Sequence, residues 1–568
     1  MTEQPFVLDA YAARSCELKT ANAFTPGLTA PSVEFRPPPF FHDADAVEAD
    51  VFGRLRAHVG SYVDLRVLRG APSEEQEAAA LRSLAEGIDL IVGPLLPRDW
   101  AGHRAGRPSL LLRRGDGYVP VLVKFHRVLE SCSLEDAPLS YSILDEPLAV
   151  RELPGRRFRW GGRLNAALQV AHHWRLLEAT GHAASEPWAG LIGTERLVPA
   201  DADSRRQHLA ITWLDLSAAV VAPSPESVPE PEAAVPVSTL ERYDFEQGHR
   251  ARLAAAALGG DGWVPPEPVM HRECAYCVWA QVCAARLPDD DLSKRINKAP
   301  LDVHEVKTLR ELGVRSVGDL ASADVDALLE RYLPRVSHRD GGEIRLRLAQ
   351  RRARLIVSGA ELERTSFGSV DVAEHELEID LDIETSADDY AYLWGFHVDD
   401  RASGARGYRA FSRFAPLDAA GERELAAEAF EWLRTVTTGR DAVVYHYSDY
   451  ETLRITRLAG QLRERGAGEL ADWIDAFATE QFVDMFPLVK AHFFGANGLG
   501  LKVVASAGAG FHWRDEEPGG LASQSWFEAA VNGGTVEERD AARTRVLEYN
   551  EDDVLATWNL RRWLRSLD

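Results

Sequence analysis

The sequence predicts an α/β protein built from several domains. The chain has 568 residues, too many for a single hydrophobic core, and its 45% hydrophobic content indicates that most of it folds. Helix-like stretches precede strand-like runs in the N-terminal half, and a strand with an acidic residue at every second position opens the last third at residue 376. The pattern between these regions is helical. We therefore expect three domains, at residues 1–295, 296–365 and 366–568.

The first domain is predicted to be a mixed α/β unit. A helix is expected over residues 74–86, followed by strands at 109–113 and 119–124, where aliphatic residues dominate. A long helix is expected at 164–180. These elements form the frame in which the N-terminal motifs lie.

The net charge of -24 argues against a nucleic-acid partner, because phosphate binding normally requires a basic surface. It does not exclude one, since nucleases that hold divalent cations need carboxylates at the site. One basic stripe falls within helix-like sequence and is either a phosphate-binding face or a solvated helix face. Its members are Arg345, Arg347, Arg351, Arg352 and Arg354.

The chain is expected to be cytoplasmic and to have no membrane partner. No stretch approaches the roughly 18 uninterrupted apolar residues of a membrane span, and the first residues lack the pattern of a secretory signal. Five cysteines in so long a chain cannot form a disulfide framework. Clustered thiols in a reducing compartment more often indicate a metal.

Two short helices joined by a glycine turn are predicted around Gly313 and Gly318. This arrangement resembles a helix-hairpin-helix element, which implies backbone amides that contact a phosphate. A small helical spacer is the alternative.

The C-terminal domain opens with the phrase Glu-Leu-Glu-Ile-Asp-Leu-Asp-Ile-Glu, which predicts a strand with its acids on one face. Asp382 and Glu384 are two residues apart on this strand, so both are candidates to share a metal ion. Phosphodiester hydrolysis with two metals needs about four such carboxylates, together with a group that orients the attacking water. Asp380 is the register alternative to Asp382.

Two further acidic elements follow in the chain. Glu451 closes the phrase His-Tyr-Ser-Asp-Tyr-Glu, which comes after a strand-like run at 442–445. Tyr549 and Asp553 are four residues apart on a predicted helix and therefore share one face, with Asp552 as the alternative to Asp553. Asp484 is either an additional site acid or a helix cap.

The three elements occur in the order found in DnaQ-like DEDD exonucleases and resemble the subclass whose last motif is Tyr-x-x-x-Asp. The resemblance implies an RNase H-like α/β fold and a 3′-to-5′ exonuclease that uses two Mg²⁺ or Mn²⁺ ions. It makes Asp382, Glu384 and Asp553 metal ligands and Tyr549 the residue that orients the water. Glu451 stands where the family usually has Asp, so a contact through a water is implied.

Cys274, Cys277 and Cys283 fall within one short segment, and Cys16 near the N-terminus is the candidate fourth ligand. This layout resembles RecB-family nucleases, in which a 4Fe-4S cluster joins the two ends of the nuclease domain. Zinc is the alternative, because four thiolates suit it equally well. Cys132 fits neither scheme and is expected to be an ordinary buried thiol.

Between these cysteines, two phrases resemble the PD-(D/E)XK core of restriction-endonuclease-like folds. Ser109 and Leu122 stand at the positions of the two metal-binding acids, and Lys124 keeps the lysine. Gln169 matches a downstream glutamine, and Glu48 is a candidate upstream acid. Leucine cannot coordinate a cation and serine is a poor ligand for Mg²⁺, so we expect a catalytically silent domain.

Taken together, the motifs resemble a bacterial family of RecB-like putative nucleases with a helical middle segment and a C-terminal RNase H-like domain. The implied function is a metal-dependent 3′-to-5′ exonuclease acting on DNA or RNA, with a single-stranded region or a free 3′ end as its substrate. The alternative is a non-catalytic nucleic-acid-binding or assembly protein in which both nuclease sites have decayed.

Overall fold

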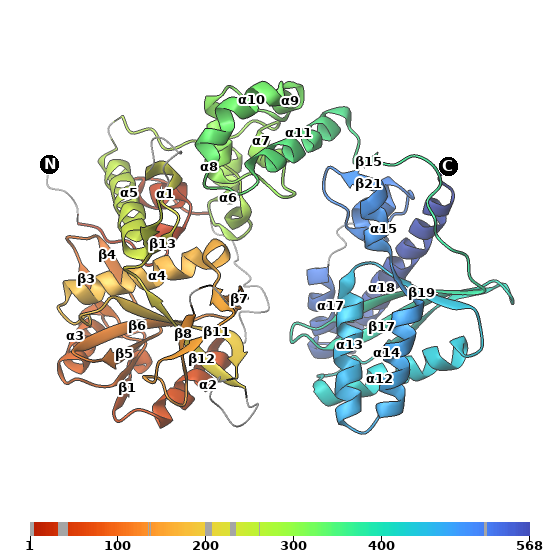
Figure 1. The fold of residues 1–568 in the computed structure, drawn as a ribbon, viewed down its shortest axis with the longest axis horizontal. Helices are drawn as coiled ribbons and strands as arrows, with labels where there is room; N and C mark the ends of the chain where they lie inside the picture. The colour runs from red at the N-terminus through yellow and green to blue at the C-terminus, as the bar shows by residue number, and fades with distance from the viewer. Residues whose placement is uncertain are drawn as a thin grey trace. The chain divides into compact units, whose positions relative to one another are not determined.

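The computed structural model describes residues 5–31, 44–133, 136, 138–198, 207–227, 235–260, 262–515 and 520–568. The chain forms two compact units (Figure 1). The first comprises residues 1–294, 301–314 and 324–345, and the second comprises 295–300, 315–323 and 346–568. In the described ranges, no helix is both long and apolar enough to cross a membrane.

The first unit is built on an eight-stranded sheet with the order β1-β2-β5-β6-β11-β12-β8-β9. Strand β5 is antiparallel to both β2 and β6, so β2 and β6 run in the same direction. The bounds are β1 Tyr62–Asp64, β2 Leu90–Val92, β5 Leu110–Arg114, β6 Gly117–Val123, β8 Leu139–Ile143, β9 Arg151–Leu153, β11 Trp188–Leu197 and β12 His208–Asp215.

Helix α4 (Trp160–Ala179) packs against this sheet and buries most of its circumference, including Trp174. The predicted helix at 74–86 is α3 (Ser73–Ala85), and the predicted strands are β5 and β6. The other helices of this unit are α1 Glu17–Phe24, α2 Ala44–Ala57, α5 Thr239–Gly259 and α6 Ala280–Ala284. Six short strands form three separate pairs: β3 Leu96–Asp99 with β4 Arg104–Gly106, β7 Leu129–Ser131 with β10 Arg156–Phe158, and β13 Ala219–Val221 with β14 Val237–Ser238.

The middle segment is helical, as the sequence predicts. Gly313 has a positive φ of 90° after α8 and so provides the expected turn, whereas Gly318 lies inside the following helix α9. The bounds are α7 Leu292–Arg295, α8 Val303–Glu311, α9 Val317–Ser322, α10 Val325–Tyr332 and α11 Gly342–Ser358.

The second unit contains a five-stranded sheet with the order β18-β17-β16-β19-β20. Strand β16 lies at its centre, antiparallel to β17 and parallel to β19. The strand bounds are β16 Leu377–Thr385, β17 Ala391–Asp400, β18 Ala405–Ser412, β19 Ala442–His446 and β20 Phe482–Asp484, and a separate pair is formed by β15 Leu362–Arg364 and β21 Phe493–Gly495.

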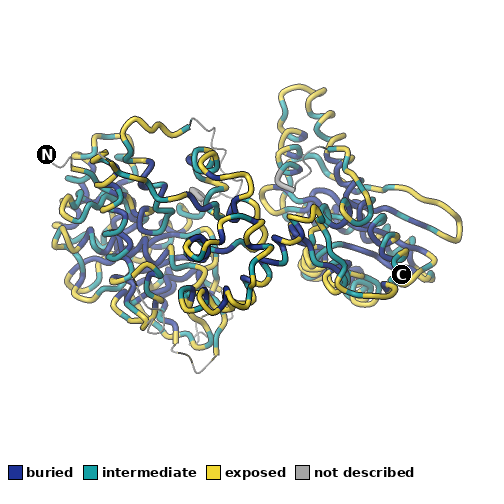
Figure 2. The backbone as a smooth tube through the Cα atoms, turned by 90° about the horizontal axis from the view of Figure 1, so that it is seen from above, coloured by how far each residue is buried: buried dark blue, intermediate teal, exposed yellow. Residues whose placement is uncertain are grey.

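Helices cover both faces of this sheet (Figure 1). The aliphatic residues of β16 point into a core formed with α12, α13 and α14, and that core is almost fully buried. The acidic residues of β16 therefore face the opposite side, where the long helix α18 crosses. The helix bounds are α12 Ala419–Thr437, α13 Asp449–Glu464, α14 Gly468–Gln481, α15 Met485–His492, α16 Leu501–Ala507, α17 Gly520–Asn532 and α18 Val536–Arg565. Figure 2 shows the buried residues concentrated inside each unit.

Candidate metal centre and active site

The acids of β16 form a row beneath α18, and the upstream half of this row is neutralised by arginine. Arg561 donates through Nε to Asp380 Oδ1 at 3.0 Å and also contacts Glu378. Arg565 lies one turn later and donates to Glu378 Oε1 at 2.7 Å. All of these carboxyl groups are fully buried, so the two acids depend on these guanidinium groups. Asp380, the register alternative, is thus a structural ion-pair partner.

The downstream half of the row has no such partner. Asp382, Glu384 and Asp553 each contribute a carboxylate oxygen, and the three oxygens lie within 4.8 Å of one another. Glu384 and Asp553 are buried and Asp382 is partly exposed. Throughout the described part of the chain, none of the three makes an ion pair with lysine or arginine. Three converging carboxylates without an ion-pair partner form a typical binding site for a divalent cation.

Neutral donors hold each of these carboxylates in place. Asn550 Nδ2 donates to Asp382 Oδ2 at 2.7 Å, and Ser523 Oγ donates to Glu384 Oε2 at 2.6 Å. Trp513 Nε1 donates to Asp553 Oδ1 at 2.7 Å. An ionised carboxylate has about four acceptor positions, so each group keeps capacity for a cation after accepting one hydrogen bond.

Burial and mutual repulsion of these carboxylates outweigh the positive charge of Lys502, which by itself lowers the pKa of all three. Burial, reinforced by repulsion from Asp553, raises the pKa of Glu384 to about 8. Burial and the same neighbour raise the pKa of Asp382 well above that of an ordinary aspartate, and burial raises the pKa of Asp553. Without a cation, the three groups cannot all be ionised at neutral pH, so binding a cation must release protons.

Tyr549 lies one helical turn before Asp553 and hydrogen-bonds to it. Lys502 Nζ, on α16, donates to the phenol oxygen at 2.5 Å and lies 4.7 Å from the ring centre. Burial, followed by the charges of the three carboxylates, raises the pKa of Tyr549 above its ordinary range. The phenol therefore keeps its proton at neutral pH and can orient a water molecule, but it cannot act as a base.

Glu451 lies near this cluster but points toward a different set of partners. It accepts a hydrogen bond from Ser448 Oγ at 3.2 Å, and its Oε2 is 3.6 Å from His446 Nδ1. Its charge still raises the pKa of Asp382. Ser448 has an unusual positive φ of 124° and is held by Asp484, which accepts from its backbone N–H at 2.9 Å.

Asp484 also caps helix α15 through the backbone N–H of Phe486, at 2.8 Å. Of the two roles considered for this residue, the structure therefore shows the capping one. Asp552, the alternative to Asp553, accepts from Arg514 Nε at 2.9 Å and is thus an ion-pair partner.

A cavity of about 400 Å³ opens beside the carboxylates, lined by Asp382, Tyr447, Lys502 and Asp553 among others.

These contacts include four residues for which the sequence alone provided no functional prediction: Lys502, Trp513, Ser523 and Asn550. Asn550 adjoins Tyr549 in the last motif, so its position was a usable signal. The other three come from separate segments that carry no recognisable pattern, and only the folding of the chain brings them to the carboxylates.

The ion pairs of Arg561 with Glu378 and Asp380 can be tested by mutation. Arg561→Met should lower the free energy of unfolding of the second unit by about 3–5 kcal/mol, because Glu378 and Asp380 would stay buried without a full counter-charge. Arg406→Met is the matched control, since Arg406 pairs with Asp399 but its side chain is 57% exposed; it should cost about 1 kcal/mol or less. Urea unfolding measures both, and equal losses would contradict the assignment.

The comparison with known families supports this geometry. Residues 379–565 match the model of the RNase_H superfamily. The C-terminal unit contains an RNase H-like domain. The match begins within β16 and ends at the last residue of α18, so it includes both halves of the carboxylate cluster. RNase H superfamily domains are typically metal-dependent nucleases. No curated protein and no solved structure matches the chain.

The N-terminal unit lies outside the RNase H-like match, and the remnants that the sequence suggested there gather around one cavity of about 570 Å³. Its lining includes Glu48, Ser109, Leu122, Lys124 and Gln169. Lys124 Nζ donates to Gln169 Oε1 at 2.5 Å. The residues of two strands and a helix thus meet at the end of β6, as a shared site would require.

The four cysteines of the predicted cluster approach one another in the first unit. In addition to burial, the charge of Cys277 raises the pKa of Cys274 and of Cys283, and that of Cys274 raises the pKa of Cys283 and of Cys16. Cys16 N–H donates to Glu273 at 2.9 Å, which fixes the start of α1 beside the 274–283 segment. Cys132, expected to be buried, is partly exposed and has no place in this group.

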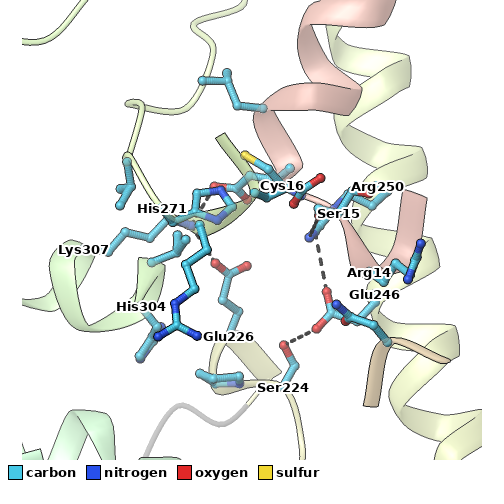
Figure 3. A pocket seen from close by; sticks show the side chains of 18 of the residues that line it. Arg14, Ser15, Cys16, Ser224, Glu226, Glu246, Arg250, His271, His304 and Lys307 are labelled. Atoms are coloured by element: carbon cyan, nitrogen blue, oxygen red, sulfur yellow. Dashed lines mark hydrogen bonds and ion pairs between the residues drawn. The ribbon is translucent and has the colours of Figure 1, made fainter. Parts of the chain in front are cut away.

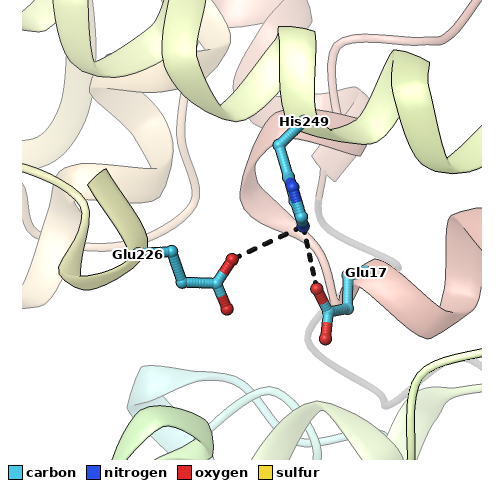
Figure 4. Close-up of side chains that lie close together, drawn as sticks. All are labelled: Glu17, Glu226 and His249. Atoms are coloured by element: carbon cyan, nitrogen blue, oxygen red, sulfur yellow. Dashed lines mark hydrogen bonds and ion pairs between the residues drawn. The ribbon is translucent and has the colours of Figure 1, made fainter. Parts of the chain in front are cut away.

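A second ionic network ties α1 to distant segments of the same unit (Figure 4). His249 Nε2 lies 2.9 Å from Glu17 and 3.5 Å from Glu226. Lys307 Nζ lies 2.7 Å from Glu17 and 2.6 Å from Glu226. Both glutamates thus share Lys307 and His249 as partners, so we interpret the network as a structural one that holds α1 in place.

In the adjoining cavity, of about 400 Å³, acidic side chains also pair with basic ones (Figure 3). Glu246 accepts from Ser224 at 2.9 Å and pairs with Arg242 at 2.9 Å and Arg250 at 3.5 Å.

Two arginines of the basic stripe on α11 also form ion pairs within the protein. Arg345 pairs with Glu305 at 2.6 Å and Arg351 with Glu363 at 2.7 Å. Arg242, Arg250, Arg345 and Arg351 therefore have carboxylate partners and are poor candidates for binding phosphate.

Proposed function

We propose that the protein is a metal-dependent nuclease that removes nucleotides from the 3′ end of DNA or RNA. The observation that carries this proposal is the cluster of Asp382, Glu384 and Asp553, three carboxylates within 4.8 Å of one another and without an ion-pair partner among the described residues. The RNase H-like match makes a nuclease the natural function for such a cluster. The direction of digestion rests on the resemblance to DnaQ-like exonucleases.

Two divalent cations bound at this cluster would polarise the phosphodiester and supply an activated water. In this proposal Asp382, Glu384 and Asp553 hold the cations, and Glu451 contributes through a water. Tyr549 orients the attacking water with its protonated phenol, and Asn550 keeps the Asp382 carboxylate turned toward the site. The neutral donors around the carboxylates let all three become anionic once the cations are bound.

Lys502 is proposed to position Tyr549. Lys502→Met should lower the rate of strand degradation roughly 10- to 100-fold, the loss of one charge-assisted hydrogen bond. The same change should tighten Mn²⁺ binding, because it removes a positive charge that competes for the carboxylates. Lys502→Arg keeps the charge and serves as the control for the metal effect. A rate loss accompanied by weaker Mn²⁺ binding would contradict this role.

The activity itself is tested with a single-stranded oligonucleotide labelled at either end. With the full-length protein and Mn²⁺, a 5′-labelled strand should shorten stepwise, while a 3′-labelled strand should release its label at once as a mononucleotide. The reverse pattern would overturn the direction, and internal fragments would indicate an endonuclease. Binding without any degradation would favour the non-catalytic alternative.

We also propose that the N-terminal unit is a PD-(D/E)XK fold of the RecB type that has lost catalysis. This proposal is supported by the cavity that Ser109, Leu122, Lys124 and Gln169 line together, because the sequence had assigned all four to one site. Because serine and leucine replace the two acids, this cavity has no pair of carboxylates for a cation. The division into domains at 1–295, 296–365 and 366–568 stays part of this proposal.

The cysteine group is proposed to hold a 4Fe-4S cluster through Cys16, Cys274, Cys277 and Cys283. Burial raises the pKa of Cys16 to about 11 and also raises the pKa of Cys274 and Cys283, so these thiols stay protonated unless a metal displaces the protons. In the described chain, no three cysteine sulfurs lie within 4.8 Å of one another. Four thiolates suit zinc as well as a 4Fe-4S cluster, and metal analysis distinguishes the two.

Anaerobically purified protein should therefore show a broad visible absorption band and contain iron. Cys277→Ser should remove the band, whereas Cys132→Ser should keep it, because Cys132 is not part of the group. Metal analysis together with a visible spectrum makes the measurement. A colourless wild-type protein that contains stoichiometric zinc would show that the site is a zinc site.

A further inference from the structure

The cavity at the end of β6 is lined by more cations than acids. Arg14, Arg69, Arg107 and Lys124 line it together with a single carboxylate, that of Glu48, and among the described residues no ion pair within 4 Å joins any of the four cations to an acid. This set is called the cationic cavity below. Other arginines of the first unit do have carboxylate partners, as Arg104 has Asp99 at 2.6 Å and Arg310 has Asp291 at 2.9 Å.

These four cations also act on one another. Burial, and then the charge of Arg14, lowers the pKa of Lys124 to about 7. Burial and the charge of Arg69 lower the pKa of Arg107. Arg14 additionally has a buried Nε without a hydrogen-bond partner. The lining thus carries four cations against the one acid Glu48, and this excess of positive charge in a chain with a net charge of -24 favours an anion from outside.

The chain positions this cavity at the ends of its central strands. Lys124 directly follows β6, and Gly93 directly follows β2, whose direction is the same. Arg107 precedes β5 and is fixed by donating to Gly93 O at 2.6 Å. Two exposed aromatic side chains, Tyr11 at 47% and Phe125 at 36%, also line the cavity. Cations together with exposed aromatic rings are the combination that binds single-stranded nucleic acid.

We propose that the cationic cavity binds one phosphate group of a single-stranded nucleic acid without a metal ion, with the adjoining base resting on Phe125. This inference deepens the proposed function, because it assigns the catalytically silent unit to holding the strand. Lys124 and the three guanidinium groups would replace the cations that the missing acids no longer bind. The cavity volume of about 570 Å³ leaves room for a nucleotide.

The test is binding of a short fluorescent oligothymidylate to the full-length Asp382→Ala protein in EDTA, measured by anisotropy. Without metal, the carboxylates of the C-terminal cluster repel phosphate, so the signal does not depend on the proposed nuclease site. Lys124→Met should weaken binding about tenfold or more and reduce the salt dependence by about one phosphate contact. Arg69→Gln, at an exposed position, should weaken binding in the same direction without altering the core.

Arg82→Gln is the matched control, because Arg82 is an exposed arginine of α3 that does not line the cavity; its variant should bind like the parent. Equal binding by all variants would overturn the inference. Millimolar inorganic phosphate should compete with the strand for the parent protein and not for Lys124→Met. If phosphate stabilised the protein but the strand did not bind, the site would be one for free phosphate and the proposal would be wrong.

Failure of this inference is separable from failure of the proposed function. For this purpose, Mn²⁺-dependent degradation of the strand is measured with a protein that carries Lys124→Met and keeps Asp382. Retained cleavage with unchanged binding would overturn only the cationic cavity, whereas tight strand binding without cleavage in the wild type would overturn only the nuclease.

Discussion

Asp382→Ala should reduce Mn²⁺-dependent degradation of a single strand about a thousandfold or more. The substitution removes one of three converging ligands, and metal-assisted stabilisation of the reacting phosphate contributes several kcal/mol to catalysis. Asp382 is also the partly exposed member of the cluster and lines the adjoining cavity, so a bound strand would meet it directly. Single-turnover digestion of an end-labelled strand measures the loss.

Two control variants make this result specific. Glu480→Gln removes an exposed acid from α14, which covers the opposite face of the sheet, and should leave the rate unchanged. At saturating protein, Lys124→Met should also keep substantial cleavage activity, because the proposed function places catalysis in the C-terminal unit. If degradation survived Asp382→Ala and disappeared in Lys124→Met, the active site would lie in the N-terminal unit.

Asp382→Asn should raise the melting temperature of the metal-free second unit at pH 8 by roughly 5 °C. The change removes one negative charge from the crowded cluster and keeps an oxygen that can accept from Asn550. The same variant should lose the stabilisation that Mn²⁺ gives to the wild type, which is about 2.7 kcal/mol at a hundred times the dissociation constant. One substitution thus separates stability from metal binding.

The pH dependence has a definite sign. The pKa of Glu384 is about 8 in the folded metal-free protein, against an ordinary value of 4.5. The folded state therefore holds a proton that the unfolded state loses, and this stabilising contribution is complete below pH 4.5 and disappears as the pH rises to about 8. The gain from Mn²⁺ should be larger at pH 8 than at pH 6. Calorimetric melting at both values, with and without Mn²⁺, tests this, and a gain that is independent of pH would contradict it.

The sequence predicted the carboxylate cluster because its local geometry is simple. Residues two apart on a strand project from one face, and residues four apart on a helix do the same. Asp382 with Glu384, and Tyr549 with Asp553, are such pairs, and both follow from sequence spacing alone. The helix and strand positions around 74–124 were also predictable, since aliphatic runs mark the buried strands β5 and β6.

Register and partners were not predictable in the same way. Asp380 and Asp382 lie on the same face of β16, and the sequence offers no rule that separates them. The difference comes from α18, where Arg561 reaches Asp380 but no arginine reaches Asp382. Lys502, Trp513 and Ser523 come from three further segments, and only the tertiary fold directs them at the carboxylates. The same holds for the cationic cavity, whose excess of cations over acids is a property of packing.

The central claim is that three converging carboxylates without an ion-pair partner among the described residues form a centre for divalent cations. Isothermal titration of Mn²⁺ into the metal-free protein, repeated in two buffers of different ionisation enthalpy, tests this most directly. We expect uptake of two ions by the wild type, accompanied by proton release and abolished in Asp382→Asn. No uptake at the site, or uptake that Asp382→Asn leaves unchanged, would contradict the claim.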